Sequence, residues 1–551
     1  MKVEPTYQKL RGGYYTPKPI SDFIAKWAIQ SKESIVLEPS CGDGNFLESL
    51  VSVYHELGLK SGSEIASNIK GIEYDIEESQ KSLHRLKNLG IPQNNNSVLN
   101  GDFFSYCKKF LAEGLFFDAI VGNPPFIRYQ NFLEEHRTIA FEIMTNAGLK
   151  PTRLTNAWVP FLIASSLLLT KNGRLGMVIP AELFQVSYAS ETRQFLSDYF
   201  SKITIVTFKK LVFDDIQQEV VLLLCEKNGK ENTGIKVAEL NDVEDLVTFN
   251  PKDLLSLELK PLDHSKDKWT QYYLTAEEIM MLRNLRKHPK VTVSGDVIDV
   301  DVGVVTGLNE YFVLNENEAI DRNLTSYTKR IITRSAHLEG AIMTEADWAN
   351  NVAKQYSTSL FYPPDLPIEE QSNEVQQYIT YGEEIGVNKG YKCRIRKRWF
   401  IVPSIWTPDG FILRQVHGYP KIIINEVGAT CTDTVHRVRF KDGYNGRFIA
   451  AAFVNSLTLA FSEVVGRSYG GGVLTFEPSE SENLPLPLIG AEKLDLLEID
   501  KLLRANDVEA VLDITDKVLL IEGLGLTQQE TLKLRDIWRK LRDRRINRKK
   551  R

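Results

Sequence analysis

The tetrapeptide NPPF at residues 123–126 follows the apolar run 116–121. Of the motifs in this sequence, it indicates the chemistry of the protein most directly. Two prolines in series remove two backbone donors and force an extended chain, so the apolar run must leave its sheet there. The Asn123 amide and the Pro124 carbonyl then lie at the carboxyl edge of a sheet, where α/β proteins bind ligands. Two fixed acceptors beside the Phe126 ring suit one task, which is holding the exocyclic amino group of a planar heterocycle.

Methylation of a nucleobase amine explains these residue types. The amine of adenine or cytosine is a poor nucleophile, because its lone pair is delocalised into the ring. Acceptors aimed at both N–H bonds favour a more tetrahedral nitrogen and stabilise the positive charge that grows as it attacks a methyl sulfonium. An asparagine cannot act as a strong base, so positioning and electrostatics must carry the reaction. The alternative is that Asn-Pro-Pro is an ordinary turn.

The upstream segment 34–50, SIVLEPSCGDGNFLESL, predicts a short buried strand, a tight turn at Gly42 and Gly44, and a helix. This arrangement lets a ligand approach backbone amides at a helix N-terminus. Glu38 at the strand end would repel a pyrophosphate, whereas it suits a cationic amino-acid group.

Two further strand ends follow in order. KGIEYD at residues 70–75 ends near Glu73, an acid placed to accept both hydroxyls of a ribose. SVLNGDFF at residues 97–104 brings Asp102 and Phe103, which could read an adenine amino group and stack on its ring. Each signal is weak alone, because carboxylates at strand ends are usually solvated and Phe is usually core. Taken together and in this order, the motifs at the strand ends are a specific signal.

This series resembles the motifs of the gamma class (TaqI type) of S-adenosylmethionine-dependent DNA adenine-N6 methyltransferases, found in bacterial restriction-modification systems. The matching segments are YTP at 15–17, LEPSCGDGNFL, GIEYD, GDFF, NPPF, VIPAELF at 178–184 and LVFDDIQQEVVLLLCEK at 211–227. The resemblance implies a Rossmann-like α/β domain with a mainly parallel sheet and S-adenosyl-L-methionine as cofactor. By this likeness the cofactor site is lined by Thr16, Glu38, Pro39, Ser40, Cys41, Gly42, Glu73, Tyr74, Asp102, Phe103, Pro125 and Phe161.

The same likeness implies that Asn123 and Pro124 hold the target amine. It also implies that Phe126 and Phe213 stack on the two faces of the target base. The family often has Tyr where this chain has Phe126, which keeps stacking but removes a hydroxyl. Phe213 aligns only through the apolar strand 220–225, so a plain core role is an equal alternative.

Composition bounds the class of protein. A chain of 551 residues is too long for one core, so two large domains are expected. Five scattered cysteines without a CxxC pair argue against a disulfide framework or a zinc site, and no metal is predicted. There is no apolar signal core, and the apolar stretch 158–169 is too short to span a bilayer. We therefore expect cytoplasmic residence, and the resemblance implies a bacterial, nucleoid-associated enzyme.

The formal net charge is −5, yet basic residues are concentrated locally. Residues 538–551 carry nine Lys or Arg against one Asp, and KCRIRKR at 392–398 has five basic residues in seven. Such stripes can contact phosphates despite an acidic total. The alternative for the C-terminal tail is a solvated helix end.

We expect the domain boundary within residues 227–260, with a methyltransferase domain at 1–245 and an α+β DNA target recognition domain at 246–551. Residues 302–314 and 467–478 resemble pieces of such recognition domains. Their glycine turns make Thr306, Asn309, Arg467 and Tyr469 candidate DNA contacts, although plain hairpin turns are an alternative. Double-stranded DNA is the predicted partner, while a cognate restriction endonuclease and the oligomeric state are left open.

The predicted reaction is site-specific methylation of the N6 amine of an adenine flipped out of duplex DNA. Cytosine N4 is the nearest rival, because its amine poses the same problem. RNA and protein-glutamine methyltransferases share the Asn-Pro-Pro-aromatic motif, but they do not usually carry so large a second domain. An inactive DNA-recognition subunit is the non-enzymatic alternative, and the intact site residues argue against it: Glu38, Glu73, Asp102 and Asn123.

Overall fold

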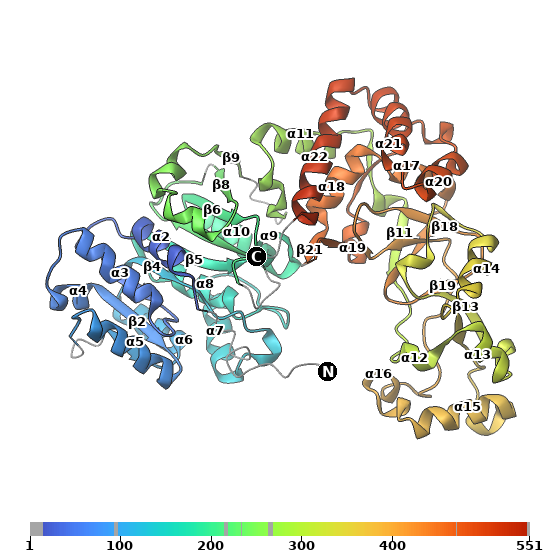
Figure 1. Cartoon of the computed structure of the whole chain (residues 1–551), viewed down its shortest axis with the longest axis horizontal. Helices are drawn as coiled ribbons and strands as arrows, with labels where there is room; N and C mark the ends of the chain where they lie inside the picture. Colours follow the sequence, from blue (N-terminus) through green and yellow to red (C-terminus); the bar gives the residue numbers. More distant parts are fainter. Residues whose placement is uncertain are drawn as a thin grey trace. The chain divides into compact units, whose positions relative to one another are not determined.

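The computed structural model describes residues 15–92, 97–213, 219–232, 234–262, 268–469 and 471–547 (Figure 1). The chain forms two compact units. The first extends to Met280 and also includes Asn547, and the second is Met281–Ile546. Helix α11 (Ala276–Arg286) spans the division.

A nine-stranded sheet forms the centre of the first unit. In sheet order its strands are β3 (Val98–Asn100), β2 (Ile69–Glu73), β1 (Val36–Glu38), β4 (Phe117–Gly122), β5 (Leu169–Pro180), β7 (Val220–Glu226), β6 (Lys202–Phe208), β8 (Gly234–Leu240) and β9 (Lys260–Pro261). Strands β7 and β9 run antiparallel to their neighbours, and the other pairings are parallel. The order reverses between β1 and β4, and ligands bind at such switch points, outside the carboxyl ends of the strands.

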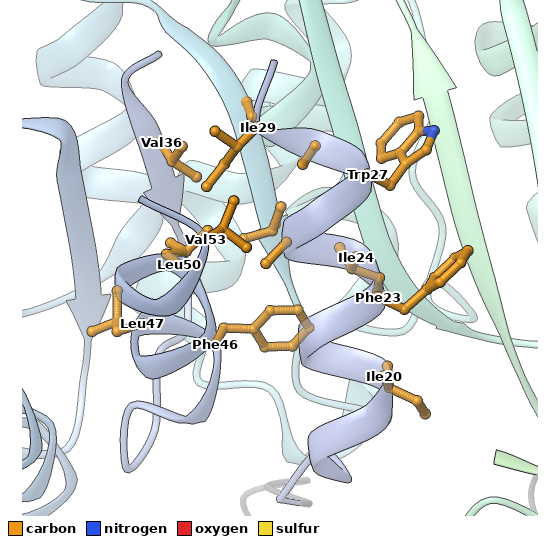
Figure 2. Packing of buried hydrophobic residues seen from close by; sticks show 14 of the residues in the cluster. Ile20, Phe23, Ile24, Trp27, Ile29, Val36, Phe46, Leu47, Leu50 and Val53 are labelled. Carbon is orange, nitrogen blue, oxygen red and sulfur yellow. The ribbon is translucent and has the colours of Figure 1, made fainter. Parts of the chain in front are cut away.

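Helices cover this sheet through periodic apolar residues. In α2 (Lys18–Ala28), Ile20, Phe23 and Ile24 recur at helical spacing and are buried in one cluster with Leu47 and Leu50 of α3 (Asn45–Glu56), as Figure 2 shows. The remaining helices of this unit up to α10 are α4 (Gly62–Asn68), α5 (Ile76–Asn88), α6 (Phe103–Glu113), α7 (Glu134–Asn146), α8 (Trp158–Leu167), α9 (Glu182–Gln185) and α10 (Ser190–Tyr199).

The mainly parallel α/β fold predicted for the N-terminal half is confirmed, and each motif-bearing apolar run is a strand. The segment 227–260, which the sequence suggested as the domain boundary, differs from expectation, because it contributes β8 and β9 to the sheet. Its polar residues instead form short turns of helix, capped by Asp242 and Asn250. The compact units accordingly divide later in the chain.

The second unit combines four smaller sheets with helices, which confirms the predicted α+β class. The sheets are β11-β20-β16-β18-β14, β12-β15-β13-β19, β17-β22-β21 and β10-β23. Their strands are β10 (Val291–Val293), β11 (Ile298–Val302), β12 (Val313–Leu314), β13 (Thr328–Ile332), β14 (Ile342–Met343), β15 (Ser359–Phe361), β16 (Gly410–Leu413), β17 (Gln415–Val416), β18 (Ile422–Asn425), β19 (Thr430–Cys431), β20 (Val435–Phe440), β21 (Arg467–Tyr469), β22 (Val473–Thr475) and β23 (Pro485–Pro487).

Helices of this unit cap and connect its sheets. They are α12 (Asn309–Phe312), α13 (Glu316–Asp321), α14 (Glu345–Ala353), α15 (Asn373–Glu384), α16 (Tyr391–Arg394), α17 (Gly446–Phe453), α18 (Ser456–Val465), α19 (Pro478–Ser481), α20 (Leu496–Arg504), α21 (Val508–Thr515) and α22 (Gln528–Ile546). The apolar segment 446–465 forms two helices, because the first ends at its C-cap Val454 and Asn455 caps the second. Within the described residues no single helix is long and apolar enough to cross a bilayer, although the bent pair α17–α18 meets that test by length and composition alone.

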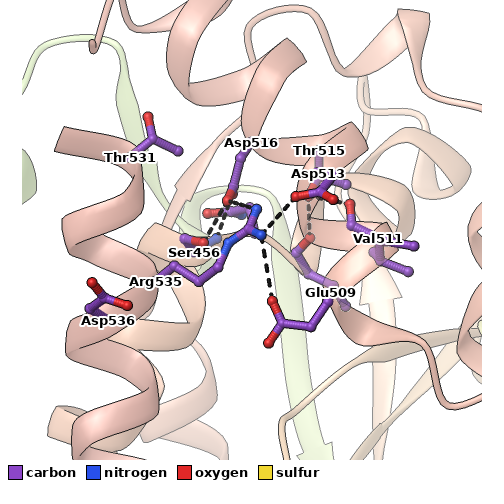
Figure 3. Close-up of polar contacts among 12 residues, drawn as sticks. Ser456, Glu509, Val511, Asp513, Thr515, Asp516, Thr531, Arg535 and Asp536 are labelled. Atoms are coloured by element: carbon purple, nitrogen blue, oxygen red, sulfur yellow. Dashed lines mark hydrogen bonds and ion pairs between the residues drawn. The ribbon is translucent and has the colours of Figure 1, made fainter. Parts of the chain in front are cut away.

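The basic helix α22 is held by buried ion pairs. Arg535 donates to Asp513 at 2.7 Å and to Asp516 at 3.0 Å, and Asp516 also accepts from Ser456 (Figure 3). Arg545 donates to both carboxylate oxygens of Glu463, at 2.9 and 2.6 Å. Part of the basic charge near the C-terminus is therefore used inside the second unit.

Candidate active site at the carboxyl edge of the first sheet

The two loops that follow β1 and β4 lie side by side. The Ser40 hydroxyl donates to the Asn123 backbone carbonyl at 3.3 Å. A Cβ on Gly122 would lie 3.4 Å from Pro39 Cδ, so the strand ends touch. The parallel pairing of β1 with β4 causes this meeting, because the carboxyl ends of parallel strands share one edge.

The aromatic residues predicted to flank the target base belong to one apolar region. Phe126 is half-buried and packs against the cluster shown in part in Figure 2, which includes the buried Phe213. Phe213 is the last described residue before the gap at 214–218. The base sandwich itself stays a prediction.

The glycine loop after β1 is tied to β2 by the predicted ribose-binding acid. Glu73 accepts from the Gly42 amide and from the Asp75 amide, each at 2.8 Å. Gly44 has φ of 90°, and a Cβ there would lie 3.0 Å from Ser82 Oγ. Ser82 in turn donates to the Gly42 carbonyl at 2.7 Å. The loop is thus fixed in place from two sides.

Glu38 is buried at the end of β1, with 2% of its surface exposed. Its Oε2 atom has no hydrogen-bond partner among the residues that the structure describes. Burial, reinforced by the neighbouring carboxylates of Glu73 and Asp43, raises the pKa of Glu38 well above its usual range. A buried carboxyl with an unused acceptor oxygen suits a cationic group. Glu38 therefore fits the ammonium group at the amino-acid end of S-adenosylmethionine.

Asp102 caps helix α6, which begins at Phe103. One carboxylate oxygen accepts from the Ser105 amide at 2.8 Å and the Ser105 hydroxyl at 2.9 Å. The other oxygen lies 3.6 Å from Nδ1 of His136, whose ring meets the exposed Tyr74 edge-on at 4.7 Å. His136 comes from α7, and no sequence signal connected it with Asp102.

The rings of Phe103 and Phe161 are stacked on each other, with centroids 5.1 Å apart and planes 20° apart. A third ring between them would need about 7 Å, since each aromatic contact takes about 3.5 Å. An adenine between these two rings therefore does not fit this arrangement. Thr16 is buried and its carbonyl accepts from Asn45, while Pro125 is half-buried beside Asn123.

A polar cluster that the sequence did not indicate supports the NPPF loop. Asn156 accepts from the Tyr129 amide at 3.3 Å, just after this loop. Its side chain donates to Tyr188 at 3.0 Å and to Glu182 at 3.3 Å, and the Tyr188 hydroxyl donates to Glu182. The Ala157 amide donates to the Ile127 carbonyl at 2.9 Å. Glu182 lies in the VIPAELF motif, but only the fold connects that motif with Asn156.

The candidate DNA contacts of the second unit differ in accessibility. Thr306 is buried, at 2% exposure, and its hydroxyl donates to Asn309 Oδ1 at 2.6 Å, so it does not fit the expectation of a base contact. Asn309 is exposed. Arg467 donates to Glu480 at 2.8 Å, and the Tyr469 side chain lies outside the described part.

The buried acid at the end of β1 and the Asn-Pro-Pro-Phe loop after β4 lie together at the switch point of the sheet, as the motif series predicts for a methyltransferase. The family model N-6 DNA Methylase matches residues 2–287, and the model Type II methyltransferase M.Eco57I, C-terminal domain, matches residues 266–520. The chain belongs to the N-6 DNA methylase family. It is an adenine-specific DNA methyltransferase, which confirms the predicted enzyme and favours N6 of adenine over N4 of cytosine.

Individual relatives extend over most of the chain. Type II methyltransferase M.AccI of Acinetobacter calcoaceticus is 23% identical over 492 residues, covering 86% of this chain and 85% of that one. Type II methyltransferase M.XamI of Xanthomonas campestris pv. amaranthicola is 20% identical over 496 residues, with the same coverage. The structure of the Type IIL restriction-modification enzyme MmeI in complex with DNA matches 96% of this chain and 75% of that chain, with a TM-score of 0.59 and 12% identity. This last likeness shows a shared fold.

Proposed function

We propose that the chain is a gamma-class enzyme that uses S-adenosylmethionine to methylate adenine N6 in a base flipped out of duplex DNA. The observation that carries this proposal is the contact between the loops after β1 and β4. It brings the buried Glu38 carboxyl and the Asn-Pro-Pro-Phe acceptors to one edge of the sheet. A cationic methyl donor and an amine acceptor then have sites side by side.

The residues that would hold the cofactor follow the strand order. Glu38 would accept from its ammonium group, Glu73 from its ribose hydroxyls, and Asp102 from its adenine amine through the oxygen that faces His136. The exposed ring of Tyr74, beside His136, is placed to cover the adenine. When bound, the cofactor supplies an electrophilic methyl group on a sulfonium.

The chain's own residues prepare the amine. The Asn123 side-chain oxygen and the Pro124 carbonyl accept from its two N–H bonds, which stabilises the developing positive charge on nitrogen. Phe126 stacks on the flipped base and fixes its plane. No residue needs to form a covalent bond, and the surplus proton leaves after transfer. The Ser40 hydroxyl holds the Asn123 backbone, so the two binding loops stay in register.

The named relatives suggest the biological setting. Since M.AccI and M.XamI are Type II methyltransferases, we infer that this chain is the modification enzyme of a type II restriction-modification system. Its substrate would be double-stranded DNA, read by the second unit, and a cognate restriction endonuclease would be its functional counterpart.

Asn123→Ala tests the catalytic assignment. It should lower kcat by about 10²–10³, by analogy with the loss of one oriented transition-state hydrogen bond, and leave cofactor affinity unchanged. Methyl transfer to duplex DNA is followed by nucleoside mass spectrometry, which also identifies N6-methyladenine, and cofactor binding by calorimetry. Asn146→Ala, at an exposed asparagine, is the matched control. Near-normal turnover of Asn123→Ala would overturn the assignment.

A further inference from the structure

Two segments of the second unit, about ninety residues apart in sequence, are joined at one surface. Arg396, just after α16, donates to the Val305 carbonyl at 3.0 Å and the Thr306 carbonyl at 2.7 Å. Its guanidinium also lies over the Phe312 ring, 5.4 Å from the centroid. The glycine turn before α12 and the basic segment around α16 therefore form a single structural element.

Gly307 permits this close approach. Its φ is 97°, and a Cβ would lie 3.1 Å from Cys393 Sγ and 3.2 Å from Lys392 Cβ. Cys393 is buried, and Arg398 is paired with Asp365 at 2.6 Å. Cys393, Arg396 and Arg398 thus anchor the basic segment.

A rigid aromatic core lies beneath the two segments. Tyr311 and Tyr378 stack at 4.7 Å with planes 7° apart, and each hydroxyl donates to the other residue's carbonyl. Trp399 packs on Tyr311 at 5.5 Å. The surface therefore rests on a preformed base, so binding would cost little ordering entropy.

The residues that point outward combine positive charge with apolar side chains. Lys392, Arg394 and Lys397 are exposed, and their neighbours Tyr391 and Ile395 are 66% and 61% exposed. On the glycine turn, Val305 and Leu308 are exposed beside Asn309. Glu310 is the one acid in the two segments 305–310 and 389–397.

We propose that this surface, formed by residues 305–309 and 391–397 and here called the α16 surface, binds the sugar-phosphate backbone of duplex DNA. The three exposed cations match phosphate charge in a chain whose net charge is negative, while Tyr391 and Ile395 contact the sugars between phosphates. Asn309 adds an exposed polar side chain to the same surface. The inference rests on the proposed function and adds where the DNA is held.

The test removes the three cations together. In the full-length enzyme, Lys392→Gln/Arg394→Gln/Lys397→Gln is compared with Lys354→Gln/Lys501→Gln/Lys517→Gln, which removes the same charge at exposed positions elsewhere in the unit. Duplex affinity is measured by fluorescence anisotropy from about 50 to 200 mM salt, since counterion release gives a slope of about 0.9 per phosphate contact. The α16 variant should lose affinity equally for cognate and non-cognate duplexes, and its salt slope should become shallower by up to about 2.7.

Several outcomes distinguish this inference from the proposed function. If wild type neither binds duplex DNA nor methylates it, the proposed function fails. If wild type binds and both triple variants behave alike, the α16 surface is not a DNA contact. A change in sedimentation behaviour of the α16 variant, with its salt slope intact, would make the surface a protein interface and overturn the inference. Tyr391→Ala should weaken binding without changing the salt slope, because it removes no charge.

Discussion

At the scale of single residues, the site depends on a buried acid that the free protein does not fully satisfy. Glu38 has an oxygen without a hydrogen-bond partner in the described chain, and burial beside Glu73 raises its pKa. Such a group destabilises the protein alone and becomes useful when a cation binds. Strained or unsatisfied groups of this kind are typical of binding sites.

The sign of the pH effect follows from this raised pKa. The folded protein holds the Glu38 proton more tightly than the unfolded chain does, so this group lowers stability as pH rises from its ordinary pKa, about 4.3, toward its folded value. Glu38→Gln should remove this part of the pH dependence of Tm. It should also weaken S-adenosylmethionine binding by at least about tenfold, equivalent to 1.4 kcal/mol.

Proton release provides a second measurement of the same change. Binding of a cation should ionise Glu38, so calorimetry of wild type in buffers of different ionisation enthalpy should detect a released proton within that pH window. Glu38→Gln should lack this release, and the exposed Glu33→Gln should keep it. Equal proton release in wild type and Glu38→Gln would contradict the role of Glu38.

At the scale of elements, the loop after β4 is stabilised by more than its prolines. Asn156 joins the backbone at Tyr129 to the Glu182–Tyr188 pair, so the loop is fastened to the segment that follows β5. Burial, reinforced by the Glu182 carboxylate, raises the pKa of the Tyr188 hydroxyl, which therefore stays a donor at ordinary pH. We infer that the cluster helps to position the loop that carries Asn123.

Asn156→Ala should therefore lower kcat by about 10–100-fold while leaving cofactor affinity unchanged, since a small displacement of positioned groups is costly in catalysis. A second measurement uses 2-aminopurine at the target position, whose fluorescence rises when it leaves the duplex stack and is quenched by a neighbouring ring. This fluorescence should also change, because Phe126 lies between the two anchored ends of the loop. Tyr188→Phe should have a smaller effect in the same direction. Unchanged kcat and fluorescence would make the cluster merely structural, and exposed Asn146→Ala is the control.

The sequence predicted those elements whose signals are local. Strands β1, β2, β4 and β7 end where apolar runs meet Gly, Pro or charged residues, and Glu38, Glu73 and Asn123 follow directly from those ends. The partnerships of His136, Asn156 and Arg396 could not be predicted, because each joins segments whose proximity only the fold creates. The burial of Thr306 was missed for the same reason, since a glycine turn looks exposed in sequence.

At the scale of the whole molecule, the chain divides into a unit that carries the candidate active site and a unit that contains the C-terminal helix α22. The sequence suggested the basic C-terminal stretch as a DNA contact, but Arg539 is paired with Glu509 and Arg545 with Glu463. Removing residues from Arg544 onward would therefore damage the unit itself. A test of the tail in DNA binding must begin after Asn547, with residues that lie outside the described part.

The buried pair between α22 and α18 provides the last prediction. Arg545 and Glu463 are each about 3% exposed, and Arg545 also donates to the carbonyls of His417 and Gly472. Arg545→Met leaves an unpaired buried acid and should destabilise the second unit by about 3–5 kcal/mol, whereas Arg545→Met/Glu463→Leu should recover much of this loss. Breaking one partner costs more than replacing both.

Urea unfolding with and without S-adenosylmethionine distinguishes the unfolding transitions of the two units. The cofactor at 100 times its Kd should stabilise the unit that binds it by about 2.7 kcal/mol, so it identifies the first unit's transition. Arg545→Met should shift the other transition and leave the cofactor-sensitive one in place. A single transition that responds equally to the cofactor and to Arg545→Met would mean that the units unfold together. In that case the C-terminal helix would stabilise the methyltransferase site itself, and its ion pairs would become determinants of cofactor binding.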